Sequence, residues 1–186
     1  MQEQGELGGG GARGPLRQLS CIFKVHDDCR QDALALQVIQ LLDGIYRTWG
    51  LPLFLFPYRV VPNRTGKERS AGGIIEVCPD CKSRDQLGKQ GATTLRQYFL
   101  NRYGAEHGAR FERAQRNFSL SLASYAVACF LLQIKDRHNG NLLLDRQGHL
   151  IHIDFGFVMG GAYAANPHPH RPQPLTRTLS LTSPSP

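Results

Sequence analysis

Hydrophobic residues recur along the chain with helical and with strand spacing, and the order of these patterns predicts its elements. Apolar residues three and four positions apart predict an amphipathic helix over residues 31–48, which Gly50 and Pro52 close. Short runs rich in β-branched and aromatic residues predict strands at 21–25, 53–56, 58–61 and 73–77. Two more helices are predicted at 94–103 and 110–133, the second largely buried. This order is typical of an α+β fold.

A β-hairpin is predicted after the last helix. Residues 141–144 and 149–153 are short apolar runs, and the turn-rich segment 145–148 separates them. The midpoint between Asn141 and Asp154 falls at this turn, so pairing of the strands brings both side chains to the same open end. An amide and a carboxylate brought together in this way can share a bound metal ion.

The two ends of the chain lack such patterns. Residues 1–20 contain the glycine run 8–11 and few apolar positions, so we expect a flexible leader. No strand pattern precedes the glycine run and no lysine of a phosphate-binding loop follows it, so it predicts no nucleotide site. Residues 159–186 are rich in Pro, Ser and Thr, and we expect them to form a disordered tail. The predicted domain therefore covers residues 21–158.

The composition limits the size of the domain, the cellular location and the kinds of partner that the chain can have. The 186 residues, 41% of them hydrophobic, suffice for one domain with a core. The formal net charge of +7 suits nucleotide phosphates or anionic lipid head groups, and it suits an ordinary solvated surface equally well. Five cysteines, an odd number, and the lack of a secretory leader pattern predict a cytoplasmic protein. The longest apolar stretch, 118–134, is too short and too polar for a membrane span, so we expect any membrane contact to be peripheral.

The tripeptide Asp154-Phe155-Gly156 carries the most specific chemistry. It stands 13 residues after Asn141 and 18 after Asp136. The interval from Asp136 to Asn141 matches a kinase catalytic loop, in which an Asp orients the acceptor hydroxyl and an Asn and the DFG Asp hold metal ions. The sequence therefore predicts ATP and Mg²⁺ as cofactors, with Asn141 and Asp154 as the metal ligands.

The residue order in this loop narrows the type of kinase. Protein kinases carry His-Arg-Asp, whereas residues 136–138 read Asp-Arg-His, which resembles the phosphatidylinositol 3-/4-kinase superfamily. Residues 22–32, IFKVHDDCRQD, resemble the ATP-lysine strand and acidic turn of that superfamily, although His26 stands where glycine is usual. Segments 56–61, 75–81 and 83–88 are similar to the type III alpha phosphatidylinositol 4-kinases. The resemblance covers about residues 21–158.

The resemblance implies a two-lobed protein-kinase-like (lipid kinase) fold that transfers the ATP γ-phosphate to the 4-hydroxyl of phosphatidylinositol. The substrate would lie in a membrane, and the cytoplasmic protein would act peripherally at the plasma membrane, with scaffold or regulatory proteins as further partners and no nucleic acid. The implied residues fall into three groups: Lys24, Asp32 and Tyr58 around the ATP phosphates and the inner pocket wall; Glu76, Val77 and Cys78 at the adenine hinge; Asp136 and His138 in proton transfer and γ-phosphate contact.

Other interpretations remain open. The family has an activation loop and further helices after its DFG motif, and residues 157–186 resemble neither, so we expect an incomplete C-lobe and an isolated chain without useful kinase activity. A noncatalytic pseudokinase or interaction fragment is therefore an alternative. An atypical protein Ser/Thr kinase, which shares the DRH and DFG motifs, is another. The pair Cys78 and Cys81 would suit zinc or redox chemistry, but no second pair accompanies it with zinc-ribbon spacing.

Overall fold

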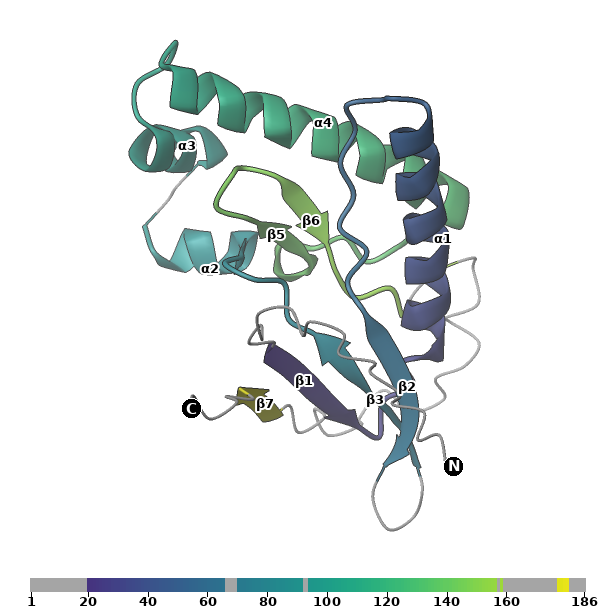
Figure 1. Ribbon diagram of the computed structural model, residues 1–186. Coiled ribbons are helices and arrows are strands. Elements are labelled where there is room, and N and C mark those ends of the chain that lie inside the picture. The colour runs from purple at the N-terminus through teal and green to yellow at the C-terminus, as the bar shows by residue number, and fades with distance from the viewer. Residues whose placement is uncertain (1–19, 66–69, 92–93, 157, 159–176, 181–186) are drawn as a thin grey trace, which may run out of the picture.

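The computed structural model describes residues 20–65, 70–91, 94–156, 158 and 177–180 (Figure 1). The fold mixes helices and sheets, as the sequence predicts. Its elements, in chain order, are β1 (Ser20–Val25), α1 (Arg30–Thr48), β2 (Val60–Thr65), β3 (Ser70–Glu76), β4 (Lys82–Ser83), α2 (Arg84–Lys89), α3 (Leu95–Tyr103), α4 (Ala109–Leu132), a 3-10 turn η1 (Asn139–Asn141), β5 (Leu142–Leu144), β6 (Leu150–His152) and β7 (Arg177–Ser180).

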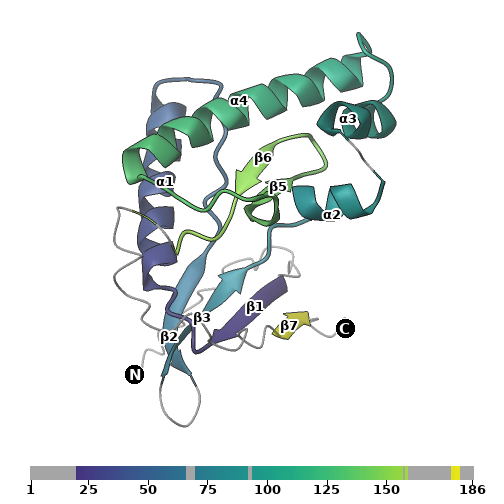
Figure 2. The ribbon, with the colours of Figure 1, turned by 180° about the vertical axis from the view of Figure 1, so that it is seen from behind.

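One antiparallel sheet has the strand order β2-β3-β1-β7. Lys24 of β1 pairs with Gly73 of β3, and a Cβ atom at Gly73 would lie only 3.0 Å from the Sγ atom of Cys29. Glycine at this position therefore lets Cys29, which is fully buried, pack against the sheet just before α1 begins. Figures 1 and 2 show α1 leading away from the end of this sheet, toward α4.

A second, smaller antiparallel sheet has the order β4-β5-β6 and lies beneath α4 in both views (Figures 1 and 2). Its β5–β6 hairpin is the one predicted from sequence, with Leu142 paired with His152. Gly148 closes the turn with φ of 91°, a left-handed conformation that glycine adopts without strain. In the described part of the chain, no helix is long and apolar enough to cross a bilayer.

Two apolar clusters hold these elements together. The larger joins Ile39 of α1, Leu55, Tyr125 of α4 and Phe155, all of which are at most 2% exposed. The smaller lies under α2, α3 and the first half of α4, where Phe99 and Phe111 pack over the hairpin. Because the larger cluster joins α1, α4 and the residues after β6, it positions the segments that carry the candidate site.

The predicted strand at 53–56 is wrong. These residues have no strand structure, and their backbone instead bonds to side chains of α4: Phe54 N donates to Ser124 Oγ at 3.0 Å and Phe56 N donates to Tyr125 Oη at 3.2 Å. These residues are apolar because they pack against the core, and a short apolar run of this kind looks the same in sequence as a strand. The next predicted strand, at 58–61, begins only at Val60 and continues to Thr65.

Two short elements, β4 and α2, were not predicted. Ser83 caps α2 in a capping box: its Oγ accepts from Gln86 N at 3.1 Å, and Gln86 Oε1 accepts from Ser83 N at 2.8 Å. The sequence signal was present, since Ser83 and Gln86 have the spacing of that motif.

Strand β7 lies within the tail that the sequence predicts to be disordered. Its four residues pair antiparallel with β1, so the prediction does not hold for them. The rest of that prediction, at 159–176 and 181–186, and most of the predicted leader lie outside the described residues.

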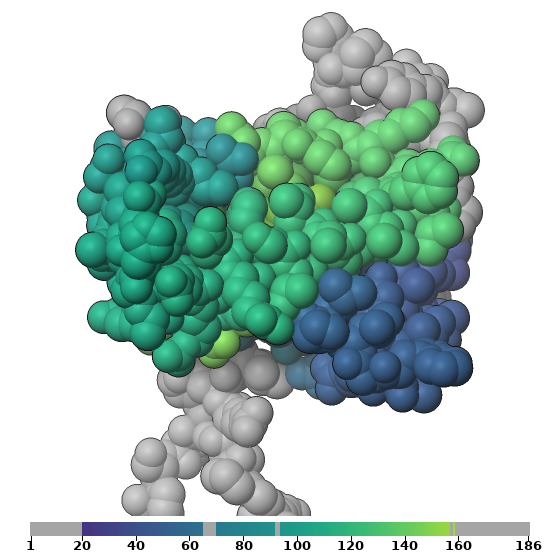
Figure 3. Space-filling view, turned by 90° about the horizontal axis from the view of Figure 1, so that it is seen from above, coloured from purple at the N-terminus to yellow at the C-terminus, as the bar shows by residue number. Residues whose placement is uncertain are grey.

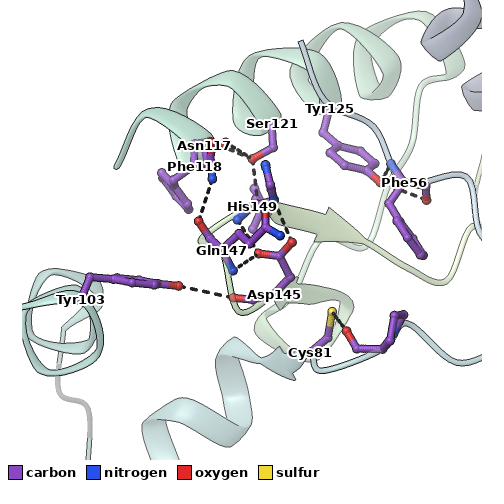
Figure 4. A network of polar contacts seen from close by, with 12 residues as sticks. Phe56, Cys81, Tyr103, Asn117, Phe118, Ser121, Tyr125, Asp145, Gln147 and His149 are labelled. Atoms are coloured by element: carbon purple, nitrogen blue, oxygen red, sulfur yellow. Dashed lines mark hydrogen bonds and ion pairs between the residues drawn. The ribbon is translucent and has the colours of Figure 1, made fainter. Parts of the chain in front are cut away.

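A polar network fastens the hairpin to α4 (Figure 4). Ser121 is fully buried; its hydroxyl donates within α4, to Asn117 O at 2.7 Å, and accepts from Leu150 N of β6 at 2.8 Å. Asn117 Nδ2 also donates to the carbonyl of Gln147 in the turn at 2.9 Å. The hairpin therefore depends on a side chain of α4 to satisfy a buried backbone amide.

Ser121→Ala is expected to destabilise the protein by about 1–3 kcal/mol, because the Leu150 amide would remain buried without an acceptor. Chemical denaturation monitored by circular dichroism measures the loss. Ser119→Ala is the matched control, since Ser119 lies on the exposed side of the same helix and bonds only the carbonyl of Gln115; it should change stability by less than about 0.5 kcal/mol. Equal losses for the two variants would contradict this account of the network.

Candidate active site

The loop that follows α4 carries Asp136 and His138. Helix α4 ends in the left-handed residue Gln133, and Asp136 is also left-handed, with φ of 54°. Gly140 N donates to His138 Nδ1 at 3.0 Å, so the proton of the neutral imidazole lies on Nε2, which is 3.9 Å from Asp136 Oδ2. The structure thus places the two predicted proton-transfer residues side by side, with both side chains half exposed.

Asn141 connects this loop to the hairpin. It is 6% exposed, and its Nδ2 donates to the carbonyl of Asp136 at 3.1 Å, which fixes the orientation of its amide group. Its own carbonyl accepts from Ile153 N at 3.1 Å. The hairpin therefore brings Asn141 next to the residue that precedes Asp154, as the pairing argument from sequence requires.

The backbone of Asp154 is held from two sides. Its amide donates to Tyr58 Oη at 3.2 Å, and its carbonyl accepts from Arg137 Nη2. Arg137 Nη1 also donates to the carbonyl of Ile153 at 2.7 Å, and its guanidinium lies 5.6 Å from the centre of the Phe155 ring. Asp154 has φ of 61° and is exposed, so its carboxylate projects from a fixed backbone. Non-glycine residues held in the left-handed conformation are strained, and such residues cluster at functional sites.

Phe155 anchors this segment in the core. It is fully buried, its ring stacks on Tyr58 with centroids 6.2 Å apart, and its amide donates to Asp32 Oδ1 at 2.7 Å. Burial raises the pKa of Asp32, the Phe155 amide bond opposes this, and the nearby charge of Asp154 adds to it. Burial likewise raises the pKa of Tyr58, so its hydroxyl stays protonated while it accepts from Asp154. Two residues predicted on the inner pocket wall thus bind the DFG segment directly.

Lys24 lies on β1 near these carboxylates. Its Nζ atom is 2.9 Å from Asp27 Oδ2. Burial would lower its pKa, but the hydrogen bond and charge of Asp27, with the charges of Asp154 and Asp32, raise it above its ordinary value. The ammonium group is therefore positively charged at neutral pH and lies near the carboxylates of Asp27, Asp32 and Asp154.

The predicted hinge residues lie at the end of β3, whose last residue is Glu76. The Val77 amide donates to the carbonyl of Ser20 at 2.9 Å, so it is engaged within the sheet. Cys78 is 8% exposed, and burial raises the pKa of its thiol to about 12, which keeps it neutral and weakly nucleophilic. The Glu76 carboxylate binds Arg59, at 3.1 Å from its Nε atom, and points to a structural use of that side chain.

Three residues that contact the site were given no role there from sequence. Asp27 pairs with Lys24, Arg137 holds the carbonyls before Phe155, and Gln31 Nε2 donates to the carbonyl of Val158 at 3.1 Å. Asp27 and Gln31 lie inside the segment 22–32 that identified the ATP-lysine strand, and Arg137 lies inside the DRH motif. Their position inside these motifs was the sequence signal that could have indicated a role in the site.

The donors present fit a magnesium ion completed by phosphate oxygens. Asn141 and Asp154 supply one amide and one carboxylate, both hard oxygen donors, and Mg²⁺ bound with nucleotides commonly takes one or two protein ligands. Among the described residues, no three His, Cys, Asp or Glu side chains gather to hold a metal by themselves.

A strand lysine, a DRH loop and a DFG segment held beside that loop are the features by which this region resembles a lipid kinase. The chain belongs to the phosphatidylinositol 3- and 4-kinase family, whose sequence model matches residues 18–184.

Among its curated relatives, phosphatidylinositol 4-kinase alpha 1 of Arabidopsis thaliana is 54% identical over 149 residues, which is 80% of this chain and 7% of that protein. Phosphatidylinositol 4-kinase stt4 of Schizosaccharomyces pombe is 49% identical over 139 residues, 75% of this chain and 7% of the relative. The putative phosphatidylinositol 4-kinase alpha-like protein P2 of Homo sapiens is 46% identical over 167 residues, 79% of this chain and 27% of the relative. The chain thus spans only a small part of the relatives it matches.

Proposed function

We propose that this chain is the ATP-binding and phosphoryl-transfer region of a phosphatidylinositol 4-kinase, organised in two lobes. The sheet β2-β3-β1 would form one wall of the nucleotide site, and the DRH loop with the β5–β6 hairpin the other. The observation that carries the proposal is the fixed DFG segment: Asp32, Tyr58 and Arg137 bind its backbone, which leaves the Asp154 carboxylate exposed.

Asn141 and Asp154 would hold magnesium, which when bound neutralises the charge of the ATP phosphates. Lys24 would contact the α- and β-phosphates as a point charge, in exchange for part of its pairing with Asp27. The carbonyl of Glu76 and the backbone of Cys78 would meet the adenine edge, because the amides of Glu76 and Val77 already donate to the carbonyls of Arg59 and Ser20.

Asp136 would orient the inositol hydroxyl and accept its proton as the hydroxyl oxygen attacks. His138 would donate its Nε2 proton as a hydrogen bond to the γ-phosphate, since its Nδ1 atom is occupied by the Gly140 amide. Both side chains are exposed enough to reach a substrate from outside. A loose phosphoryl-transfer transition state needs positioning more than a strong base, and this arrangement supplies positioning.

The substrate is inferred from the relatives, which are named phosphatidylinositol 4-kinases. Phosphatidylinositol in a membrane would be the acceptor, its 4-hydroxyl the site of transfer, and the protein would work peripherally at the cytoplasmic face, where scaffold proteins could recruit it.

The test places this segment in a phosphatidylinositol 4-kinase in exchange for its own equivalent and measures transfer from labelled ATP. Vesicles containing phosphatidylinositol should be phosphorylated in a Mg²⁺-dependent way. Vesicles containing phosphatidylinositol 4-phosphate should not, because the acceptor hydroxyl is blocked. Equal labelling of both lipids would refute the 4-hydroxyl assignment, and labelling of a Ser/Thr peptide alone would favour the protein kinase interpretation.

A further inference from the structure

Strand β2 is one edge of the larger sheet, and its own sequence protects that edge. In the order β2-β3-β1-β7, β2 pairs with β3 on one side only. It contains Pro62, which has no amide to donate, and the exposed Arg64. Proline and charged residues at such positions keep a sheet edge from pairing with the strand of another chain.

Strand β1 has no such protection on its outer side. Residues Ser20–Phe23 include no proline, no glycine and no charged side chain. The only charged residue of β1 is Lys24, whose ammonium group lies 2.9 Å from the Asp27 carboxylate. An uncharged strand edge presents a row of N–H and C=O groups that can pair with another chain. The outer edge of β1 therefore has to be covered by something other than its own sequence.

Strand β7 covers this edge, and both ribbon views show it as the outermost strand, beside β1 (Figures 1 and 2). Ser20–Phe23 pair antiparallel with residues 177–180, while Lys24 and Val25 lie beyond the end of β7. The helices do not serve this purpose, since α4 and the neighbouring end of α1 form the surface on the side away from this sheet (Figure 3).

The cover is short, and the polypeptide chain ties it to the domain. Segment 159–176 joins β7 to Val158, which is 3% exposed and whose carbonyl accepts from Gln31 Nε2 at 3.1 Å. Four paired residues supply few hydrogen bonds, each with a small net contribution to stability. A covalent link raises the effective concentration of such a strand, on the order of millimolar for short tethers. Strand β7 can therefore hold the edge in competition with strands of other chains.

We propose that segment 177–180 is a guard strand, which closes the outer edge of β1 and so prevents β1 from pairing with β1 of a second copy. Antiparallel pairing of two Ser20–Phe23 segments about a two-fold axis places uncharged residues opposite each other, so no like charges oppose it. The joined sheet would have β2 at each end, where Pro62 hinders further addition. The assembly expected without the guard strand is therefore a closed dimer.

The test compares the 186-residue chain with the double variant Thr178→Pro with Leu179→Pro. Neighbouring residues of a strand direct their amides to opposite sides, so one of the two prolines removes an amide that faces β1. In sedimentation velocity over a range of concentrations, the double variant should reach about twice the mass of the native chain. In dilute solution, the amides of Ser20–Phe23 that face β7 should exchange hydrogen about tenfold faster or more, and those of the β5–β6 hairpin at the native rate.

The double variant Ser183→Pro with Ser185→Pro is the matched control, because it adds as many prolines to the same tail outside β7. It should keep the native mass and the native exchange rates. A chain that ends at residue 176 should behave like the Thr178→Pro with Leu179→Pro variant. A peptide of residues 175–181 should return both to the native mass, whereas the same peptide with the two prolines should not.

Two results would overturn the proposal. Native mass and native exchange in the Thr178→Pro with Leu179→Pro variant would show that β7 does not cover the edge. Faster exchange without a change of mass would show that β7 covers the edge but does not prevent association. Circular dichroism checks that each variant is folded, and since mass and exchange are measured without ATP, the result does not depend on the proposed function.

Discussion

Asp154→Asn is expected to lower kcat for phosphatidylinositol phosphorylation by about 10³-fold or more in a phosphatidylinositol 4-kinase that contains this segment. The change removes the carboxylate that would hold magnesium and leaves every backbone contact of the residue in place, since Tyr58 and Arg137 bind its amide and carbonyl. Asparagine also tolerates the left-handed φ of 61°, which alanine does not, so the loss reports on charge rather than on strain.

Steady-state kinetics with labelled ATP measure this effect, and thermal denaturation shows whether the fold survives. Asp85→Asn is the control, because that carboxylate is 52% exposed and pairs only with Lys89 on the surface of α2. Turnover within a factor of two for Asp85→Asn, beside the large loss at Asp154, is the expected contrast. A folded Asp154→Asn enzyme with near-native turnover would exclude the residue as a metal ligand.

Lys24→Met should reduce kcat/KM for ATP by about 10²–10³-fold, because the phosphates lose a charge and methionine retains most of the apolar stem. The charges of Asp27, Asp154 and Asp32 hold the pKa of Lys24 above its ordinary value, so the native ammonium group is charged throughout the neutral range. Removing it leaves Asp27 without its partner, and part of the loss therefore comes from repulsion between that carboxylate and the phosphates.

Lys89→Met is the corresponding control, since Lys89 is 76% exposed and its ion pair with Asp85 lies on the surface. Its kcat/KM for ATP should stay within a factor of two of native. The double change Lys24→Met with Asp27→Asn separates the two contributions, because it removes the repulsion as well. An unaltered kcat/KM for Lys24→Met would contradict the phosphate-binding role.

Sequence reasoning predicted the hairpin and the long helices because their patterns match their environment. The turn at 145–148 separates two apolar runs, and the register that brings Asn141 toward Asp154 follows from simple pairing. Helix α4 was predicted within one residue of its observed ends for the same reason: one side is buried at helical spacing.

The contacts that hold the DFG segment could not be predicted from local patterns. Asp32 and Phe155 are 123 residues apart, and Tyr58 and Asp154 are 96 apart. The strand prediction at 53–56 was wrong for a related reason: the backbone amides of this segment bond to the side chains of Ser124 and Tyr125 in a distant helix instead of to a neighbouring strand. A single sequence shows which residues are apolar but not which distant side chain satisfies a given amide.

The bond between Asp32 and Phe155 also has a consequence for the order in which a growing chain can fold. Helix α1 is synthesised before its partner: its Asp32 carboxylate is 4% exposed in the folded protein, and the Phe155 amide that binds it is made 123 residues later. At about 5–20 residues per second this is a delay of roughly 6–25 seconds. During that interval Asp32 has to remain hydrated, so α1 cannot settle against its final neighbours until the hairpin and Phe155 have been synthesised. The candidate site is thus assembled only after both of these distant segments have been synthesised.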